Sequence, residues 1–256
     1  MITMTDAAST FDPAELAQRF ATAKDRIAAA QLPGPETIAE AIAVQALLVT
    51  PEEAPASGYK VARSPEGVGV AGRLSPVAIA GPDGQPVTFR WRKGLRVEAE
   101  IGFRLASDLP PRQTGYSRGE VIAAIGAVHL GVEVLDSRIE EGGKAPYLLF
   151  LADRLGNAGY ALGPELPRNL LDGAEGRSLE VSLDGAPLFA GEAHHPAGDV
   201  LAWLVGWANE TQRAEDTLAT GEIVTTGSLC GALDVAAPGR LEVRLDGSWT
   251  LPVRFE

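Results

Sequence analysis

The chain has 256 residues, and its 22 lysine and arginine residues against 34 aspartate and glutamate residues give a formal net charge of −12 at pH 7. This charge argues against a protein that neutralises nucleic-acid phosphates or lies on an anionic membrane. Apolar residues make up 45% of the chain, enough for one large core, and the single cysteine, Cys230, excludes an internal disulfide and a thiolate metal cluster. A bound metal would therefore need oxygen or imidazole ligands.

The amino-terminal segment lacks the pattern of a signal peptide. Residues 1–11 are polar and mildly acidic, with no basic start and no apolar run. The longest apolar runs, such as Val200 to Val205, are far shorter than the roughly 20 residues of a membrane span. We therefore expect a soluble, cytoplasmic protein.

Two helices are predicted in the first part of the chain. Asp12-Pro13 is a typical helix start, and apolar residues follow it at helical spacing, at Leu16, Phe20 and Ala23. A second apolar face recurs at Ile38, Ile42, Ala46 and Val49, and this helix should end before Pro51. We assign residues 1–55 to an N-terminal helical lead-in.

From residue 58 onward, short β-branched and aromatic runs alternate with glycine and proline. Strands are expected over residues 58–61, 77–80, 87–91, 97–105, 131–135, 179–183, 186–190, 222–226, 241–245 and 251–255. A capping box from Ser117 to Glu120 predicts a helix with an apolar face from Val121 to Val128, and another helix is expected over Val200 to Asn209. This irregular order predicts an α+β fold, a mixed β-roll with flanking helices, in which residues 56–256 form the main domain.

Three glutamates stand out in the expected strands. Glu98 and Glu100 are two residues apart in an apolar run, so a strand places both side chains on one face. Glu133 lies among apolar residues that would normally bury it. Carboxylates are rarely buried without a partner, so three converging acids favour a hard divalent cation, Mg²⁺ or Mn²⁺. Alternatively, Glu98 and Glu100 face solvent and Glu133 pairs with an arginine such as Arg138.

Five segments follow one another in a characteristic order. They are GYKV at 58–61, VEAEIGF at 97–103, VEVLDSRI at 132–139, LAWL at 201–204 and LATGEIVTTGS at 218–228. With the helical segment AIAVQ at 41–45, this order resembles the 2-keto-4-pentenoate hydratase group of the fumarylacetoacetate hydrolase superfamily over about residues 35 to 230. The resemblance implies a mixed β-roll of that superfamily's C-terminal domain type, with the metal-binding catalytic domain at 56–256.

The resemblance also implies a chemistry. Glu98, Glu100 and Glu133 would hold the divalent metal, and a small 2-hydroxy-2,4-dienoate or its 2-oxo tautomer would chelate it through the 2-oxygen and a carboxylate oxygen. A Lewis acid at the 2-oxo group would stabilise the enolate. The expected protein is a metal-dependent carbon–oxygen lyase that adds water to give a 4-hydroxy-2-oxo acid, as in aromatic meta-cleavage pathways, and it is expected to be a homo-oligomer.

Lys60 matches the lysine of the group's Gly-Tyr-Lys-Val pattern and is the expected catalytic residue for proton transfer. Burial and a neighbouring cation would disfavour its ammonium form, as a general base requires. The alternative is a strand lysine whose stem reaches solvent. Arg138 could recognise the substrate carboxylate or pair with Asp136 or Glu140.

The remaining substrate-binding positions implied by the resemblance are Asp153, Thr226, Gly227 and Ser228. The hydroxyl groups of Thr226 and Ser228 could donate hydrogen bonds to a substrate carboxylate. Cys230 could line the same pocket or be a small core residue. The side chains of the adjacent His194 and His195 point apart on an extended chain, so at most one of them could enter a site. Both residues are therefore assigned to a loop.

Two segments depart from the group's pattern. The group follows its lysine with Gly, a hydrophobic residue and Thr-Ser, whereas residues 62–65 read Ala-Arg-Ser-Pro. The group's Ala-Asp-Asn-Ala-Ser pattern is also altered, and Arg154 stands where the neutral amide is expected. These changes leave two alternatives open. One is a decarboxylase, as in the 2-oxo-3-hexenedioate decarboxylases, or a C–C hydrolase of a related 2-oxo acid; the other is a non-catalytic homologue that binds a small acid.

Overall fold

The computed structural model describes residues 11–48, 58–81, 84–210, 213 and 218–256. The chain forms two compact units, one of Met1–Thr50 with Ser137–Gly156 and one of Pro51–Asp136 with Asn157–Glu256. The sequence-based division at residue 55 places segment 137–156 in the main domain, whereas this segment packs with the N-terminal helices. Val49, expected at the end of the second helix, lies outside the described residues.

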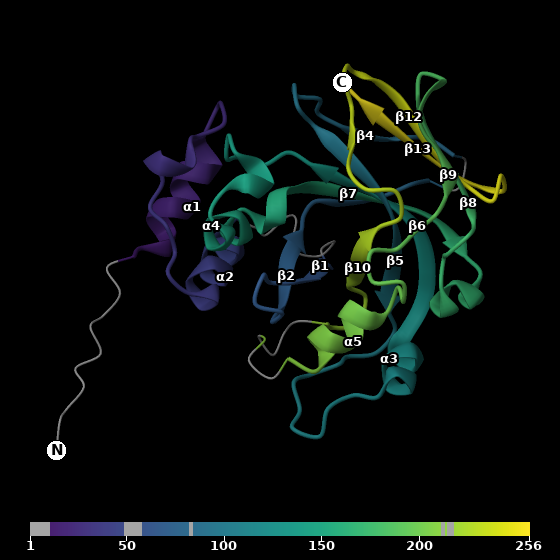
Figure 1. Ribbon diagram of the computed structural model, residues 1–256, viewed down its shortest axis with the longest axis horizontal. Helices are drawn as coiled ribbons and strands as arrows, with labels where there is room; N and C mark the ends of the chain where they lie inside the picture. The colour runs from purple at the N-terminus through teal and green to yellow at the C-terminus, as the bar shows by residue number, and fades with distance from the viewer. Residues whose placement is uncertain (1–10, 49–57, 82–83, 211–212, 214–217) are drawn as a thin grey trace. The chain divides into compact units, whose positions relative to one another are not determined.

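The first unit is built from short helices. In α1 (Pro13–Thr22) the side chain of the N-cap Asp12 accepts a 2.9 Å hydrogen bond from the backbone of Ala14. α2 (Ile38–Leu47) begins with a capping box, and α4 (Tyr147–Ala152) packs beside it (Figure 1). The buried Gln45 amide on α2 donates to the Leu151 carbonyl at 2.7 Å. The described part of this unit also contains the short 3₁₀ turns η1 (Ala29–Gln31), η3 (Gly142–Lys144) and η4 (Arg154–Gly156).

The second unit contains two sheets. The larger has the order β2-β1-β10-β5-β6-β7-β3, and β11 pairs with β5. Its strands are β1 (Gly58–Arg63), β2 (Gly69–Leu74), β3 (Val77–Ile79), β5 (Arg96–Leu105), β6 (Ile125–Leu135), β7 (Asn157–Leu166), β10 (Ile223–Ser228) and β11 (Leu233–Asp234). The smaller sheet has the order β4-β13-β12-β8-β9, with β4 (Val87–Phe89), β8 (Ser178–Leu183), β9 (Ala186–Glu192), β12 (Gly239–Leu245) and β13 (Trp249–Phe255). Strands dominate and helices are few, which confirms the predicted α+β class (Figure 1).

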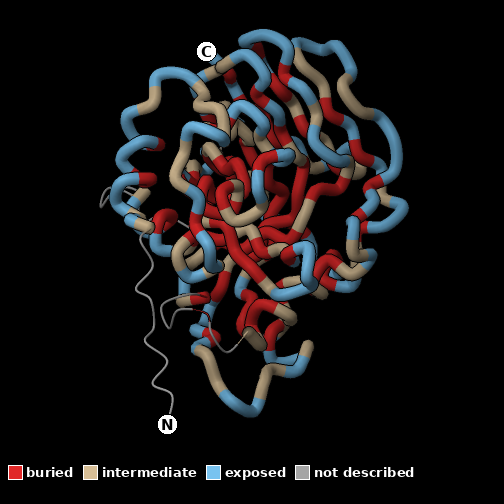
Figure 2. Tube along the Cα trace, turned by 60° about the vertical axis from the view of Figure 1, so that its left-hand side comes forward, coloured by how far each residue is buried: buried red, intermediate tan, exposed pale blue. Residues whose placement is uncertain are grey.

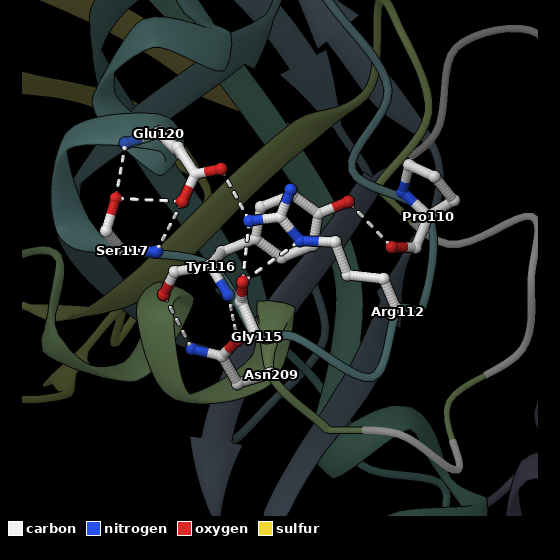
Figure 3. Close-up of polar contacts among 7 residues, drawn as sticks. All are labelled: Pro110, Arg112, Gly115, Tyr116, Ser117, Glu120 and Asn209. Carbon is white, nitrogen blue, oxygen red and sulfur yellow. Dashed lines mark hydrogen bonds and ion pairs between the residues drawn. The ribbon is translucent and has the colours of Figure 1, made fainter.

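Helices α3 (Arg118–Ala124) and α5 (Ala202–Ala208) and the turn η5 (Arg168–Asp172) flank these sheets. The predicted capping box is present at α3, where Glu120 accepts the Ser117 N–H at 2.8 Å (Figure 3). The expected helix through Val128 was wrong at its end, because α3 stops at Ala124. Residues 125–135 instead form β6, which pairs with β5 along the whole length of β5. The valine residues of this segment favour a strand.

Continuous burial distinguishes β6 from an ordinary half-exposed strand. Residues 128–134 are all buried, so both faces of this part of the strand are covered. Figure 2 shows the buried stretches of the chain in red. Side chains alternate between the faces, so the apolar residues Val128, Leu130, Val132 and Val134 share one face. The other face carries His129, Gly131 and Glu133, and this is the face that carries the site described below.

The sequence patterns did not predict β2, β7 or α4. β7 contains three of the residues that weaken a strand signal, two glycines and a proline, yet it pairs with β6 along its length. None of the described helices has both the length and the apolar character that crossing a membrane would need. The cytoplasmic location stays a prediction.

Candidate active site

Antiparallel pairing of β5 and β6 brings the three predicted glutamates together. Glu98 is the register partner of Glu133, and Glu100 is the partner of Gly131. All three side chains lie on one face of the sheet, and a carboxylate oxygen from each lies within 4.8 Å of the others. Glu100 and Glu133 are fully buried, and Glu98 is partly exposed. The solvent-facing alternative is therefore wrong for Glu100.

Lys60 reaches this cluster from β1. Its Nζ lies 2.8 Å from each carboxylate oxygen of Glu133. Lys60 is in register with Thr225 of β10, and the Thr225 hydroxyl donates to Glu100 Oε2 at 2.7 Å. The partner of Glu133 is therefore Lys60, and not the arginine that the alternative reading assigned to it.

Burial and like charge raise the pKa of both buried carboxyl groups. The pKa of Glu100 lies well above its ordinary value because of burial and the charges of Glu133 and Glu98, which Lys60 and the Thr225 hydrogen bond offset only in part. Burial, and then Glu98, raise the pKa of Glu133 against the opposing effect of Lys60. Three carboxylates against one ammonium leave an excess of negative charge in a buried place.

The same cluster sets the charge state of Lys60. Burial lowers the pKa of the lysine, but the charges of Glu133, Glu98 and Glu100 outweigh burial and raise it. Without a bound cation, the three carboxylates therefore favour the ammonium form of Lys60. The expectation that burial and a neighbouring cation disfavour this form stays a prediction.

Asn157, at the start of β7, is a site residue that the sequence reasoning missed. Its Nδ2 donates to Glu133 Oε1 at 3.0 Å, and its Oδ1 accepts the backbone N–H of Ser75 at 3.1 Å. Asn157 is fully buried. Asn157 therefore donates to the same carboxylate oxygen of Glu133 that Lys60 contacts, and no sequence motif marks this role.

Two glycines make room for a buried tyrosine beneath the carboxylates. Tyr160 of β7 is fully buried, and a Cβ on Gly131 would lie 1.9 Å from its hydroxyl oxygen. On Gly102 a Cβ would lie 2.9 Å from the same atom. Burial and the neighbouring Glu100 raise the pKa of Tyr160 well above its ordinary value, so the hydroxyl stays neutral.

A cavity of about 610 Å³ lies beside the cluster. Its wall includes Lys60, Glu98 and Glu100. Most of the other residues that line the cavity are apolar or glycine. These other residues are Val61, Ala62, Phe189, Glu192, His194, Pro196, Trp203, Gly227, Ser228, Leu229, Cys230 and Gly231. A small acid could therefore approach the carboxylate cluster and Lys60 together.

The end of β10 supplies part of this wall. Gly227 and Ser228 line the cavity, and Gly227 has a φ of +139°, in the region that favours glycine. The Ser228 hydroxyl donates to the Gly231 carbonyl at 2.9 Å. Thr226 does not line the cavity, because its hydroxyl donates to the Val200 carbonyl at 2.6 Å. Thr225, which the sequence reasoning did not select, contacts the cluster instead.

The neighbouring histidines have separate partners. His195 is buried, its Nε2 lies 3.1 Å from the Thr226 carbonyl, and its Nδ1 accepts the Ala197 N–H at 3.2 Å. Burial lowers the pKa of His195, which favours the neutral ring. His194 is exposed and its Nδ1 lies 2.8 Å from Glu175. Both lie in the loop after β9, as expected.

Arg138 and Asp153 belong to the first unit. Arg138 Nη1 lies 2.9 Å from Asp153 Oδ1, and the backbone N–H of Arg138 donates to Asp153 Oδ2 at 2.9 Å. The ion-pair partner of Arg138 is thus Asp153, which is fully buried, and not Asp136 or Glu140. Arg154 next to it is also buried, with a φ of +57°.

The chain is similar in sequence to enzymes of two activities. It is 28% identical over 164 residues to 2-hydroxyhexa-2,4-dienoate hydratase of Comamonas testosteroni, covering 62% of this chain and 60% of the relative. It is 31% identical over 180 residues to 4-oxalocrotonate decarboxylase of Pseudomonas sp. strain CF600, covering 68% and 65%. The chain thus spans somewhat less than two thirds of the length of these relatives. No family model matches it.

Solved structures share the fold. The 4-oxalocrotonate decarboxylase from Pseudomonas putida G7, complexed with magnesium and adipate, has a TM-score of 0.71 at 23% identity, covering 95% of this chain and 97% of that one. A fumarylacetoacetate hydrolase family protein from Yersinia pestis CO92 has a TM-score of 0.53 at 16% identity, covering 78% and 93%. The long strands that carry the three glutamates thus belong to a known architecture.

Proposed function

This chain belongs to the fumarylacetoacetate hydrolase superfamily, among relatives of its 2-keto-4-pentenoate hydratases and 4-oxalocrotonate decarboxylases, and on that premise we propose that it is a divalent-metal-dependent hydratase. Its substrate is a 2-hydroxy-2,4-dienoate and its product a 4-hydroxy-2-oxo acid. The observation that carries this proposal is the cluster of three carboxylates within 4.8 Å, with Lys60 on Glu133, beside a cavity of small-molecule size.

The donor set fits a divalent cation. Glu98, Glu100 and Glu133 supply the hard oxygen ligands that Mg²⁺ and Mn²⁺ prefer. Burial, and then the neighbouring carboxylates, raise the pKa values of Glu100 and Glu133, and Lys60 offsets these effects only in part. A cation bound by these residues would supply a Lewis acid for the charge that develops on the 2-oxygen of the substrate.

The reaction needs proton transfers in a place sheltered from bulk water. Ketonisation of the dienoate moves the hydroxyl proton to C5, and water then adds its hydroxyl group at C4 and its proton at C3. Lys60 lines the cavity, which supports the proposal that its amino group holds or moves a proton. Glu133 holds the Lys60 amino group in position through a contact of 2.8 Å. Asn157 in turn holds the Glu133 carboxylate through a hydrogen bond of 3.0 Å.

The test follows the ultraviolet absorbance of freshly generated 2-hydroxypenta-2,4-dienoate with the full chain and Mg²⁺, and identifies the products. We expect metal-dependent loss of absorbance and a 4-hydroxy-2-oxo acid. Glu100→Gln removes one buried carboxylate ligand and should abolish turnover, whereas the exposed Glu165→Gln on β7 should retain it. Equal turnover in Glu100→Gln and wild type would contradict the metal site.

The second candidate is decarboxylation of a related 2-oxo acid, which the 31% identical decarboxylase favours. Release of CO₂ identifies it, and a two-fragment product identifies C–C hydrolysis. A non-catalytic acid-binding homologue would bind metal and acid without turnover of any dienoate. Its Lys60→Met variant would bind the acid as the wild type does. A hydratase would lose its activity in that variant.

A further inference from the structure

One wall of the cavity comes from the edge strand of the smaller sheet and from the segment after it. Phe189 and Glu192 belong to β9, Pro196 lies in the following loop and Trp203 lies in α5. These segments close on the end of β10, since a Cβ on Gly227 would lie 3.1 Å from Pro196 and 3.3 Å from Trp203. The cavity is therefore bounded by aromatic and alkyl groups together with one further carboxylate.

The charges on the described part of this wall are mostly negative. Glu98, Glu100 and Glu192 are acidic, and Lys60 is the one lysine or arginine among the described lining residues. Lys60 already contacts Glu133, and the other basic group, His194, lies 2.8 Å from Glu175. A ligand held at the carboxylate cluster by its 2-oxo acid group would thus present its tail to apolar side chains and to Glu192.

Resting on the proposed function, we infer that the substrate carries a single carboxylate and an uncharged tail, and that Glu192 is a specificity-determining residue that disfavours dicarboxylates. An alkyl or alkenyl tail gains from burial against Phe189 and Trp203. A terminal carboxylate would lie against apolar side chains and near the exposed carboxylate of Glu192, a like charge that no lysine or arginine of the described wall near it opposes. This inference separates the two activities of the relatives, since 4-oxalocrotonate has a second carboxylate and 2-hydroxyhexa-2,4-dienoate has one.

Two 2-oxo acids of equal chain length test this inference without turnover. 2-Oxohexanoate and 2-oxoadipate have the same 2-oxo acid group and differ only at the far end, where one has a methyl group and the other a carboxylate. Calorimetric titration of the Mg²⁺-loaded full chain with each acid measures the two dissociation constants under the same conditions. We expect the dissociation constant of 2-oxohexanoate to be lower by about tenfold or more, which corresponds to about 1.4 kcal/mol.

Variants on one hairpin assign the selectivity. Glu192→Gln should reduce the preference for 2-oxohexanoate by about threefold or more, because it removes one like charge. Glu180→Gln, on β8 of the same hairpin but outside the cavity wall, should leave the preference unchanged.

Each other outcome has a defined meaning. Equal or tighter binding of 2-oxoadipate by the wild type overturns the inference and leaves the proposed function standing. An unchanged preference in Glu192→Gln overturns the role of that residue. Failure of both acids to bind in the presence of Mg²⁺ overturns the proposed function, and the inference with it.

Discussion

At the scale of single residues, the site depends on buried polar groups that satisfy one another. Glu133 is fully buried and is held by Lys60 at 2.8 Å and by Asn157 at 3.0 Å. Asn157 in turn accepts the Ser75 N–H. Because a buried polar group without a partner costs more than a hydrogen bond contributes, these contacts are coupled. Removal of one member therefore leaves another without its partner.

We predict that Asn157→Ala lowers the free energy of unfolding by about 1–3 kcal/mol, because it removes the hydrogen bonds to Glu133 and to the backbone of Ser75. Urea denaturation measures this change. Asn157→Asp should be worse, since it places a carboxylate beside Glu133, and added Mg²⁺ should recover part of its loss. A stability equal to wild type in both variants would show that the amide does not hold Glu133.

At the scale of elements, the close packing of β5, β6 and β7 leaves no space for a side chain at one position. The Tyr160 hydroxyl occupies the place where a Cβ on Gly131 would project. We expect Gly131→Ala to destabilise the protein by about 3 kcal/mol, since the ring is enclosed and cannot move away without repacking. Gly119→Ala in α3, where the nearest atom is 4.0 Å away, is the matched control. Thermal denaturation compares the two, and equal melting temperatures would contradict the packing argument.

The amino-terminal end of α3 carries a network of charged and polar groups that should make the stability of the fold depend on pH. Glu120 accepts bonds from Ser117 and contacts Arg112, whose guanidinium lies over the Tyr116 ring at 3.6 Å (Figure 3). Asn209, the residue that follows α5, donates to the Tyr116 carbonyl at 3.0 Å. This hydrogen bond links the end of α5 to the segment before α3. The hydrogen bonds from Ser117 and then Arg112 lower the pKa of Glu120 to about 2.

The sign of the pH effect follows from that lowered pKa. An ionised Glu120 stabilises the fold at pH values above its ordinary pKa of 4.5, and this contribution is lost as the pH falls from 4.5 toward about 2. In urea denaturation we expect Glu120→Gln to be less stable than wild type at pH 6.5, and less stable by a smaller margin at pH 3. Glu180→Gln serves as the control. A stability difference that stays the same at both pH values would contradict the role of the charge.

At the scale of the whole protein, metal binding should be coupled to stability. The native state gathers Glu98, Glu100 and Glu133 from two strands, and the unfolded chain does not, so Mg²⁺ should bind the native state alone. At a concentration 100 times the dissociation constant, this binding adds about 2.7 kcal/mol to the free energy of unfolding.

We therefore expect Mg²⁺ to raise the melting temperature of the wild type and not that of Glu100→Gln. With EDTA the variant should melt no lower than the wild type, because Glu100 lies buried beside two like charges. Differential scanning fluorimetry with both proteins checks the two statements. An equal Mg²⁺ shift in both would place the metal elsewhere. The predicted homo-oligomer is checked separately by light scattering after gel filtration.

Features that depend on local pattern could be predicted from the residues alone. Alternation along residues 97–103 placed Glu98 and Glu100 on one face, the box at Ser117 to Glu120 started a helix, and the order of segments predicted the superfamily fold. The carboxylate cluster could be predicted because its members lie in strands whose apolar neighbours are unmistakable.

Tertiary structure alone decided the partners. The contact of Lys60 with Glu133 spans 73 residues and that of Asn157 with Ser75 spans 82, and no local pattern encodes the register that creates them. The same applies to the hydrogen bond from Thr225 to Glu100, and to the raised pKa of Lys60. Local pattern fixes which face a side chain occupies, whereas the charge state of a buried group depends on strands that meet only in the folded protein.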